Sequence, residues 1–127
     1  MIIGYRTAIE EEALQINEKN KPFRNPAFDN RPGCGMIGNG IYLTSDPAWW
    51  HGSAFKVNWY CVFEADEDLL KKASKIWIPQ SYESKRFCRS SKSKDLWGGG
   101  EKTVAKYIRK SNLNPAETLR FSYLQSV

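Results

Sequence analysis

The chain lacks any long apolar run, and its first residues lack the pattern of a signal peptide. No apolar stretch approaches the ~20 residues that a membrane-spanning helix requires. The N-terminal residues pass from one short apolar segment directly into a polar, acidic stretch, where a signal peptide would continue with an apolar core. The sequence therefore predicts an intracellular, cytoplasmic protein that does not act in a membrane.

Cysteine and histidine are scarce, which argues against several kinds of site. The three cysteines, Cys34, Cys61 and Cys88, are odd in number and widely spaced, with no C-x-x-C pair and no histidine at zinc-ligand spacing. The single histidine, His51, has no cysteine beside it, so a Cys-His or Ser-His hydrolytic pair has little support. We expect reduced thiols and no metal site.

Composition is typical of a globular chain that forms one domain over residues 1–127. The chain is 41% hydrophobic and 26% charged, and its length suffices for one core but not for two. Aromatic residues reach 13%, including five tryptophans. Tryptophan-rich small domains often line a cleft or an interface, although a bulky core is the commoner explanation.

Positive charge is concentrated in one part of the chain. The net charge is +5, yet residues 85–110 alone carry nine basic side chains against Asp95 and Glu101. Such a patch suits an anionic partner, although a solvated face that favours solubility would look the same. The interleaved Phe87, Trp97 and Tyr107 would allow base stacking along a nucleic acid, and an acidic protein is the other candidate partner. The basic residues are Lys85, Arg86, Arg89, Lys92, Lys94, Lys102, Lys106, Arg109 and Lys110.

A glycine-flanked aromatic segment at residues 38–45 is the strongest local signal for a ligand site. Gly38 and Gly40 allow close approach of a backbone or a ligand, and Ile41-Tyr42-Leu43 has strong strand character. A ring beside the hydroxyls of Thr44 and Ser45 suits a heteroaromatic ligand. An ordinary core strand between two turns is the alternative.

The N-terminal segment predicts a strand followed by a helix. Residues 2–6 form the expected strand, and Thr7 with Glu10 makes a capping box that starts a helix ending near Asn17. Arg6 would lie at this junction, where its guanidinium could bind a pyrophosphate or orient a ribose. A surface arginine paired with one of the helix acids is the alternative.

The remaining pattern predicts an α+β fold with short helices and a mixed or antiparallel sheet. Strict alternation over residues 53–64 favours a strand with Trp59 in the core. Residues 80–100 appear as a polar, serine-rich loop ending in three glycines, which do not fit a phosphate-binding G-x-x-x-x-G-K-S/T motif. The other expected elements are a long loop over 20–40, a helical turn over 66–72, a strand over 76–78, a helix over 101–110 with Val104, Tyr107 and Ile108 inward, and a strand over 118–124 with Leu119, Phe121 and Tyr123 on one face.

Gly4-Tyr5-Arg6-Thr7 and the glycine-tyrosine segment together resemble the NAD-binding core of the ADP-ribosyltransferase superfamily. The resemblance implies a split two-sheet domain with NAD as substrate. Members of the superfamily carry a first strand ending in Tyr/Leu-Arg or Tyr/Leu-His and a later G-x-G-I/T-Y strand that holds nicotinamide. Carried over, Arg6 takes the first-strand basic position, Tyr42 stacks on nicotinamide, and Thr44 or Ser45 supplies the hydroxyl. The implied NAD-contacting residues are Tyr5, Arg6, Thr7, Gly40, Ile41, Tyr42, Thr44 and Ser45.

The resemblance also implies a catalytic glutamate in the loop before a late strand. Glu117, directly before Thr118, fits that position best, with Arg6 and Tyr42 completing the catalytic set. Glu101 is the second candidate, although a first-turn acid also interacts favourably with the helix dipole. Glu64 and Asp66, after the long strand, are further candidates.

Two functions follow from these features. The first is transfer of ADP-ribose from NAD to a macromolecular acceptor, a protein or a nucleic acid, by a small enzyme of the kind that acts as a toxin or effector. The second is a non-enzymatic basic module that binds nucleic acid or an acidic protein. The sequence leaves the oligomeric state open.

Overall fold

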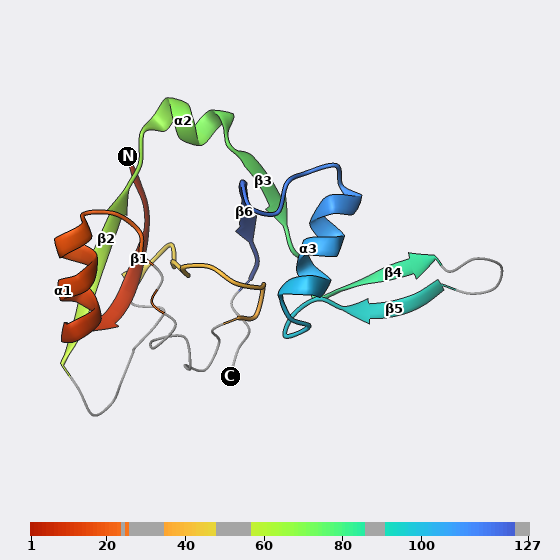
Figure 1. The fold of residues 1–127 in the computed structure, drawn as a ribbon, viewed down its shortest axis with the longest axis horizontal. Helices are drawn as coiled ribbons and strands as arrows, with labels where there is room; N and C mark the ends of the chain where they lie inside the picture. Colours follow the sequence, from red (N-terminus) through yellow and green to blue (C-terminus); the bar gives the residue numbers. More distant parts are fainter. Residues whose placement is uncertain (24, 26–34, 48–56, 86–90, 124–127) are drawn as a thin grey trace. The chain divides into compact units, whose positions relative to one another are not determined.

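A computed structural model of the chain describes residues 1–23, 25, 35–47, 57–85 and 91–123 (Figure 1). They form an α+β structure with short helices and small two-stranded sheets. The elements are β1 (Ile2–Ile9), α1 (Glu10–Lys19), β2 (Asn58–Glu64), α2 (Glu67–Lys72), β3 (Ser74–Trp77), β4 (Ser81–Lys85), β5 (Ser91–Asp95), α3 (Glu101–Lys110) and β6 (Thr118–Phe121).

The chain divides into two compact units. The N-terminal unit comprises Met1–Arg31 and Gly40–Lys72, and the C-terminal unit comprises Pro32–Asn39 and Ala73–Val127. The single domain expected over residues 1–127 stays a prediction. None of the helices in the described ranges has the length and apolar character needed to cross a membrane. Several residues and parts of ranges considered above lie outside the described ranges: Cys34, His51, residues 53–56, Arg86, Phe87, Cys88, Arg89 and residue 124.

The N-terminal unit pairs β1 antiparallel to β2 and packs α1 against this sheet. In the described part of this unit, the buried apolar residues are two alanines and two larger side chains: Ala8, Ala13, Ile16 and Phe63. The strand-to-helix order predicted for this region is confirmed. The strand is longer than expected, because pairing continues to Ile9 opposite Asn58, and the helix is shifted toward the C-terminus, ending at Lys19.

The predicted capping box at Thr7 and Glu10 is wrong. Thr7 lies inside β1, buried, opposite Tyr60. Helix α1 begins at Glu10 after Ile9, which makes no side-chain capping hydrogen bond. Cross-strand pairing with β2 satisfies the backbone through Ile9, so the helix starts two residues later than the local motif indicates.

The predicted strand over the glycine-tyrosine segment reduces to a single isolated bridge. Thr44 pairs with Tyr5 of β1, while residues 41–43 have no regular secondary structure. Gly38 and Gly40 have φ values of 95° and 156°. The carbonyl of Tyr42 accepts a hydrogen bond from the Arg6 side chain, where a strand would offer it to a backbone N–H. These departures from extended pairing shorten the strand.

The strand at β2 is confirmed over Asn58–Glu64, but the predicted burial of Trp59 is wrong. Trp59 is 47% exposed, whereas its cross-strand partner Ala8 is fully buried. Alternation decides which face a side chain occupies, but burial requires a second layer over that face. Helix α1, with ten residues, packs on this sheet and leaves Trp59 exposed.

The C-terminal unit has a larger core than the N-terminal unit. Ile78, Leu96, Val104 and Ile108 are fully buried and pack together, surrounded by half-buried Ile37, Ile76, Tyr82, Trp97, Tyr107 and Leu113. Helix α3 confirms the prediction over residues 101–110, with Val104 and Ile108 inward and Tyr107 half-buried. The short strand predicted at 76–78 appears as β3, which pairs parallel to β6.

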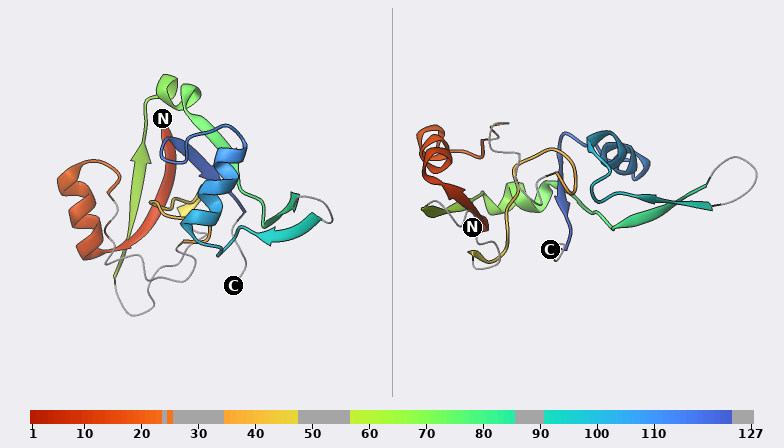
Figure 2. Two further views of the ribbon diagram at one scale, coloured as in Figure 1. Left: turned by 45° about the vertical axis from the view of Figure 1, so that its right-hand side comes forward. Right: turned by 90° about the horizontal axis from the view of Figure 1, so that it is seen from below.

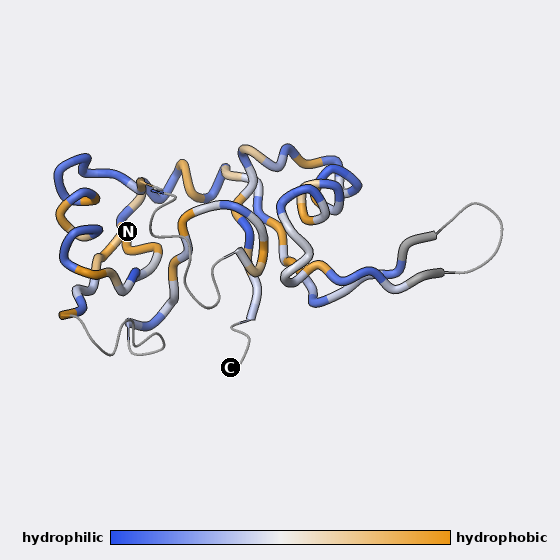
Figure 3. Tube along the Cα trace, turned by 60° about the horizontal axis from the view of Figure 1, so that its bottom comes forward, coloured by the Kyte–Doolittle hydropathy of each residue, from blue (hydrophilic) through white to orange (hydrophobic). Residues whose placement is uncertain are grey.

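The prediction of a loop over residues 80–100 is wrong in part, because these residues include an antiparallel hairpin of β4 and β5. The hairpin runs away from α3 (Figure 2), and hydrophilic residues predominate along it (Figure 3). An isolated two-stranded hairpin is marginally stable. Here its base is anchored, because Leu96 N–H donates to Gln80 O (2.8 Å) and Tyr82 packs on Tyr107 with ring centroids 5.1 Å apart. Backbone pairing without apolar alternation leaves no period-2 signal in the sequence.

Strand β6 buries the side opposite to its apolar one. Leu119, Phe121 and Tyr123 share a face, as predicted, but all three are exposed. Thr118 is buried and donates from Oγ1 to the carbonyl of Asn114 (2.6 Å). Arg120 is also directed inward, toward α3, where it forms an ion pair.

Candidate functional site

The two segments that resemble an NAD-binding core lie side by side in the N-terminal unit. Tyr5 and Thr44 exchange two backbone hydrogen bonds of 2.8 Å. Gly4 permits this approach, since a Cβ added there would lie 2.8 Å from Leu43 Cβ and 3.2 Å from the carbonyl oxygen of Thr44. The glycine of Gly4-Tyr5-Arg6 therefore has a steric role: it admits the second segment to the free edge of β1.

Arg6 is held in a buried polar cluster. Its Nε donates to Glu12 Oε1 (2.6 Å), its Nη2 lies 2.6 Å from the same oxygen, and its Nη1 donates to the carbonyl of Tyr42 (3.2 Å). The side chains of Arg6 and Glu12 are only 10% and 4% exposed. The expected alternative, pairing with a helix acid, is thus observed, but the pair is buried and not at the surface. Arg6 links β1, α1 and the Tyr42 backbone.

Cys61, the cross-strand partner of Arg6, shares this environment. Burial raises the pKa of its thiol above the usual 9.0; the charge of Glu12 raises the pKa further and that of Arg6 lowers it. The thiol is half-buried and unpaired. A raised pKa keeps the group protonated near neutral pH, so the arrangement does not activate Cys61 as a nucleophile.

The hydroxyls near Tyr42 differ in availability. Thr44 Oγ1 lies within hydrogen-bond distance of two backbone carbonyl oxygens, those of Asp46 (3.0 Å) and Tyr5 (3.3 Å), to which it can donate. The hydroxyl therefore stabilises the local fold. Ser45 is exposed, as is Gly40. The predicted contact residues Tyr5, Ile41 and Tyr42 are half-buried, while Thr7 is buried in β1. Ser45 is therefore the more accessible of the two predicted hydroxyls.

The candidate acids of the N-terminal unit lie at the far end of β2. Glu64 is the last residue of β2, opposite Ile2, and is exposed. It lies three residues from Cys61, or ~10 Å along a strand. Asp66 Oδ1 accepts the N–H of Leu69 (3.0 Å) at the start of α2, which is a capping role. Neither residue lies beside Arg6 in the register.

Glu117 lies in the C-terminal unit, directly before β6, which is where the resemblance expects an acid. The turn that carries it is held by Asn114: the Asn114 carbonyl accepts the N–H of Glu117 (3.1 Å), and Asn114 Oδ1 accepts the N–H of Ala116 (3.0 Å). Glu117 is exposed, and within the described ranges its carboxylate makes no hydrogen bond or ion pair. The acid is presented to solvent on a fixed turn.

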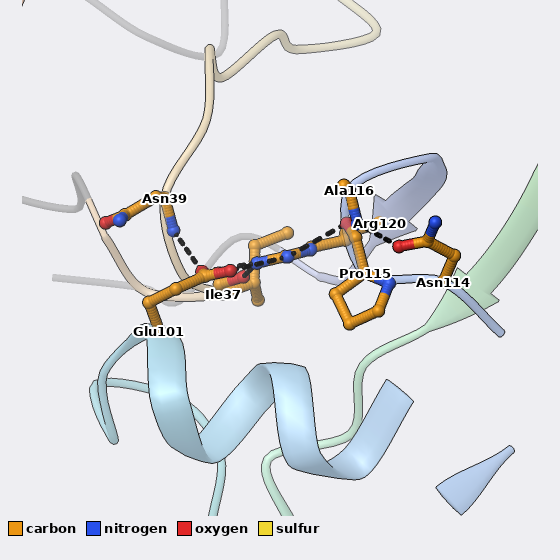
Figure 4. Close-up of polar contacts among 7 residues, drawn as sticks. All are labelled: Ile37, Asn39, Glu101, Asn114, Pro115, Ala116 and Arg120. Carbon is orange, nitrogen blue, oxygen red and sulfur yellow. Dashed lines mark hydrogen bonds and ion pairs between the residues drawn. The ribbon is translucent and has the colours of Figure 1, made fainter. Parts of the chain in front are cut away.

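Glu101, the second candidate acid, is engaged in a polar cluster at the start of α3 (Figure 4). Arg120 binds it in a bidentate manner, with Nη1 to Oε2 at 2.7 Å and Nη2 to Oε1 at 2.8 Å. The backbone N–H of Asn39 also donates to Oε2 (2.7 Å). Arg120 further donates to the carbonyls of Ile37 (3.1 Å) and Pro115 (3.3 Å). Glu101 thus fastens α3, β6 and the residue 37–39 turn together.

Gly38 covers this ion pair closely. It is buried with φ 95°, and a Cβ there would collide with Arg120 Nη1 and Glu101 Oε2. The first glycine of the Gly38-Asn39-Gly40 motif is therefore required by the C-terminal unit, where it lies against side chains of the same chain. The sequence assigned this glycine to a ligand-binding strand; its observed neighbours are Glu101 and Arg120.

An open groove runs beside α3 and this cluster. Four cationic residues and one acidic residue take part in its lining. The lining residues are Asn39, Glu101, Lys102, Ala105, Lys106, Arg109, Asn114, Pro115, Ala116 and Arg120. Within the described ranges, no three His, Cys, Asp or Glu residues gather closely enough to hold a metal ion.

Sequence reasoning missed two residues that organise these clusters. Glu12 was considered only among the helix acids that could pair with Arg6, yet its spacing of i, i+4 with Ile16 puts it on the buried face of α1. Arg120 was overlooked because it alternates with Leu119 and Phe121 in β6, on the face opposite to these apolar residues. Glu12 could have been found as a charge on the apolar face of α1, whereas Arg120 lies opposite the apolar residues of β6 and gave no such signal.

A family model described as "Family of unknown function (DUF5910)" matches residues 35–127, which include Tyr42, α3 and Glu117. No curated protein matches the chain, and no solved structure matches it. Because the match covers most of the chain, this protein belongs to the DUF5910 family.

Proposed function

We propose that this protein transfers ADP-ribose from NAD to a macromolecular acceptor. One observation carries the proposal: the Gly4-Tyr5-Arg6 strand and the glycine-tyrosine segment, far apart in sequence, are neighbours, with Arg6 bonded to the Tyr42 carbonyl. Adjacent placement of these two segments is what the resemblance to ADP-ribosyltransferases requires. The close fit at Gly4 supports it further, since that glycine is needed only if the two segments meet.

The proposed reaction is substitution at the ribose C1′ that bears nicotinamide. The C1′–N bond breaks, and its electron pair leaves with neutral nicotinamide. The ribose then has oxocarbenium character, which a nearby carboxylate stabilises electrostatically. A nucleophilic atom of the acceptor forms the new bond to C1′ and loses a proton.

In this proposal Tyr42 and Ser45 contact NAD, while Arg6 acts as a positioning residue. The guanidinium of Arg6 is nine-tenths buried and already bonded to Glu12 and to the Tyr42 carbonyl. It therefore fixes the backbone of Tyr42, so that the ring is presented in one orientation. Tyr42 packs on nicotinamide, and Ser45, whose hydroxyl is more accessible than that of Thr44, hydrogen-bonds to ribose or phosphate.

Glu117 is the proposed catalytic acid. Among the acids considered, Glu101 accepts hydrogen bonds from Arg120 with both carboxylate oxygens, and Asp66 caps α2. A carboxylate that must hydrogen-bond a ribose hydroxyl needs at least one unoccupied oxygen. Glu117 and Glu64 meet this condition, and only Glu117 precedes a late strand.

The test is release of nicotinamide from NAD by the purified chain, with cell lysate added as a source of acceptor. We expect release by the wild type and its loss in Glu117→Gln, which keeps the side-chain shape but removes the charge. Glu64→Gln is the matched control and should retain release. Tyr42→Ala should weaken NAD binding in calorimetry, whereas Tyr42→Phe should retain it, because stacking requires only the ring.

Circular dichroism of each variant separates loss of chemistry from loss of fold. If folded wild-type protein neither binds NAD nor releases nicotinamide with lysate present, the proposal is wrong. If nicotinamide release persists in Glu117→Gln but is lost in Glu64→Gln, the catalytic acid is Glu64 of β2 and not Glu117.

A further inference from the structure

Helix α3 carries an exposed row of positive charge along the groove. Lys102, Lys106 and Arg109 recur at i, i+4 and i+7, so they lie along one face, and all three line the groove. All three side chains are exposed. Within the described ranges, no carboxylate pairs with them. Like charges spaced in this way destabilise a helix slightly, which an anion bound along the row would offset.

The one acid in the groove does not neutralise this row. Both oxygens of Glu101 are bonded to Arg120, and Oε2 also accepts the N–H of Asn39. Arg120 and Glu101 thus cancel each other at one end of the groove. The charges of Lys102, Lys106 and Arg109 remain available to a ligand.

The form of the groove favours a polymer over a small anion. The groove is more open than enclosed, whereas small-molecule pockets enclose most of their ligand. Its remaining lining is made of two asparagines and small residues, Ala105, Pro115 and Ala116. From Lys102 to Arg109 the helix rises ~10 Å at 1.5 Å per residue. One strand of B-form nucleic acid carries a phosphate every ~3.4 Å, so the row spans about three phosphates.

We propose that this groove binds the phosphodiester backbone of a nucleic-acid strand, without sequence preference. Lys102, Lys106 and Arg109 contact successive phosphates, and Asn39 and Asn114 offer amide groups to sugar or phosphate oxygens. The row places three positive charges along ~10 Å of α3, which is comparable to a short run of a phosphodiester chain, where one negative charge recurs at a fixed interval. An acidic protein surface presents carboxylates with no such fixed repeat.

This inference goes beyond the proposed transfer reaction. If that reaction occurs, the bound strand is the candidate acceptor or a guide to it; binding itself requires neither NAD nor Glu117. The two proposals can therefore fail separately, because one is measured by affinity in the absence of NAD and the other by release of nicotinamide.

The experiment is fluorescence anisotropy of a labelled, mixed-sequence single-stranded oligonucleotide, titrated with the full-length protein at several salt concentrations. Three phosphate contacts predict a slope of log affinity against log salt of about −2, or about −0.7 per contact. Lys102→Ala, Lys106→Ala and Arg109→Ala should each weaken binding several-fold and reduce the slope by about 0.7. Lys21→Ala changes an exposed lysine of the N-terminal unit and is the matched control.

Three results would overturn the proposal. One is the absence of oligonucleotide binding by folded wild-type protein at low salt. Another is binding that the three groove variants leave unchanged, which would assign it to other basic residues. The third is equal competition by a polyglutamate peptide of the same charge, which would indicate an acidic protein as the partner. Circular dichroism should show that the exposed substitutions leave the fold intact.

Discussion

The N-terminal and C-terminal units each contain a strand arginine paired with a glutamate from the first turn of a helix. In the N-terminal unit, Arg6 of β1 pairs with Glu12 of α1; in the C-terminal unit, Arg120 of β6 pairs with Glu101 of α3. Each arginine also donates to a carbonyl of the segment between residues 37 and 42, Arg6 to Tyr42 and Arg120 to Ile37. In each unit, therefore, a strand arginine binds both a helix glutamate and a backbone carbonyl of this segment.

The two pairs differ in burial and geometry. Glu12 is 4% exposed and bonds Arg6 through one oxygen, whereas Glu101 is 33% exposed and bonds Arg120 through both. A buried charge left without its partner is strongly destabilising, while one that water can reach is less so. We infer that the Arg6 pair is the stronger determinant of fold, and that the Arg120 pair mainly positions the turn beside the groove.

The largest expected effect is that of Glu12→Ala. It leaves the Arg6 guanidinium buried without a carboxylate, so the free energy of unfolding should fall by about 3–5 kcal/mol. Denaturant titration measures this loss, and amide hydrogen exchange should locate it in β1 and β2. Glu11→Ala changes an exposed acid of the same turn and is the control. Equal losses in both variants would contradict the role of the buried pair.

The corresponding change in the C-terminal unit, Glu101→Ala, should cost less. Arg120 is itself only 11% exposed, but it keeps its bonds to the carbonyls of Ile37 and Pro115, and water can enter where the 33%-exposed carboxylate was, so a loss of about 1–3 kcal/mol is expected. Hydrogen exchange should increase at the Asn39 amide, which donates to Glu101. Glu83→Gln, an exposed acid of β4, is the control. A cost larger than that of Glu12→Ala would reverse the comparison.

A comparison of alanine substitutions at Gly38 and Gly35 distinguishes the cost of a steric clash from the cost of backbone strain. Gly38 and Gly35 both have positive φ, 95° and 84°, so alanine strains the backbone at either site. At Gly38 the new Cβ would also meet the ion pair, whereas at Gly35 it meets nothing within 4 Å. We expect Gly38→Ala to be less stable than Gly35→Ala by about 1 kcal/mol, because the colliding side-chain ends can shift. Parallel thermal melts measure the difference, and equal melts would argue against the close approach.

The smallest effect concerns the thiol beside the buried pair. Because the pKa of Cys61 is raised, its alkylation rate should reach half-maximum above pH 9.0. The unfolded thiol ionises at lower pH than the folded one, so this group should reduce stability as pH rises past 9.0. Glu12→Gln removes one raising charge and should lower the midpoint, while Glu11→Gln should not. Peptide mass spectrometry distinguishes Cys61 from Cys34 and Cys88.

Much of the fold could be predicted where apolar periodicity is strong. The helix over residues 101–110 and a strand over 53–64 were predicted from spacing; the helix is observed, and the strand is observed over Asn58–Glu64. The hairpin of β4 and β5 could not be found in this way, because its pairing depends on backbone bonds among polar residues. Trp59 was wrongly assigned to the core, and the burial of the apolar face of β6 could not be predicted. Alternation shows which residues share a face but not which face another layer covers.

The candidate site was predictable in its segments but not in its bonding. Gly4, Arg6 and Tyr42 were marked by their motifs, and the structure makes them neighbours. That Arg6 is occupied by Glu12, and Glu101 by Arg120, could not be read from spacing, because a charge can form a bond to any partner that the fold brings near. The capping box at Thr7 failed for the same reason: pairing with β2 outweighed a local hydrogen bond.

The sequence alone determined the α+β class, the main helices and the local excess of positive charge, since these follow from composition and from contacts within a few residues. Only the tertiary structure decided which charges are neutralised and which remain available. Arg6 and Arg120 are committed to buried or partly buried carboxylates, while Lys102, Lys106 and Arg109 stay exposed along α3. The reason is that electrostatic pairing depends on distance and burial in three dimensions, neither of which residue order specifies.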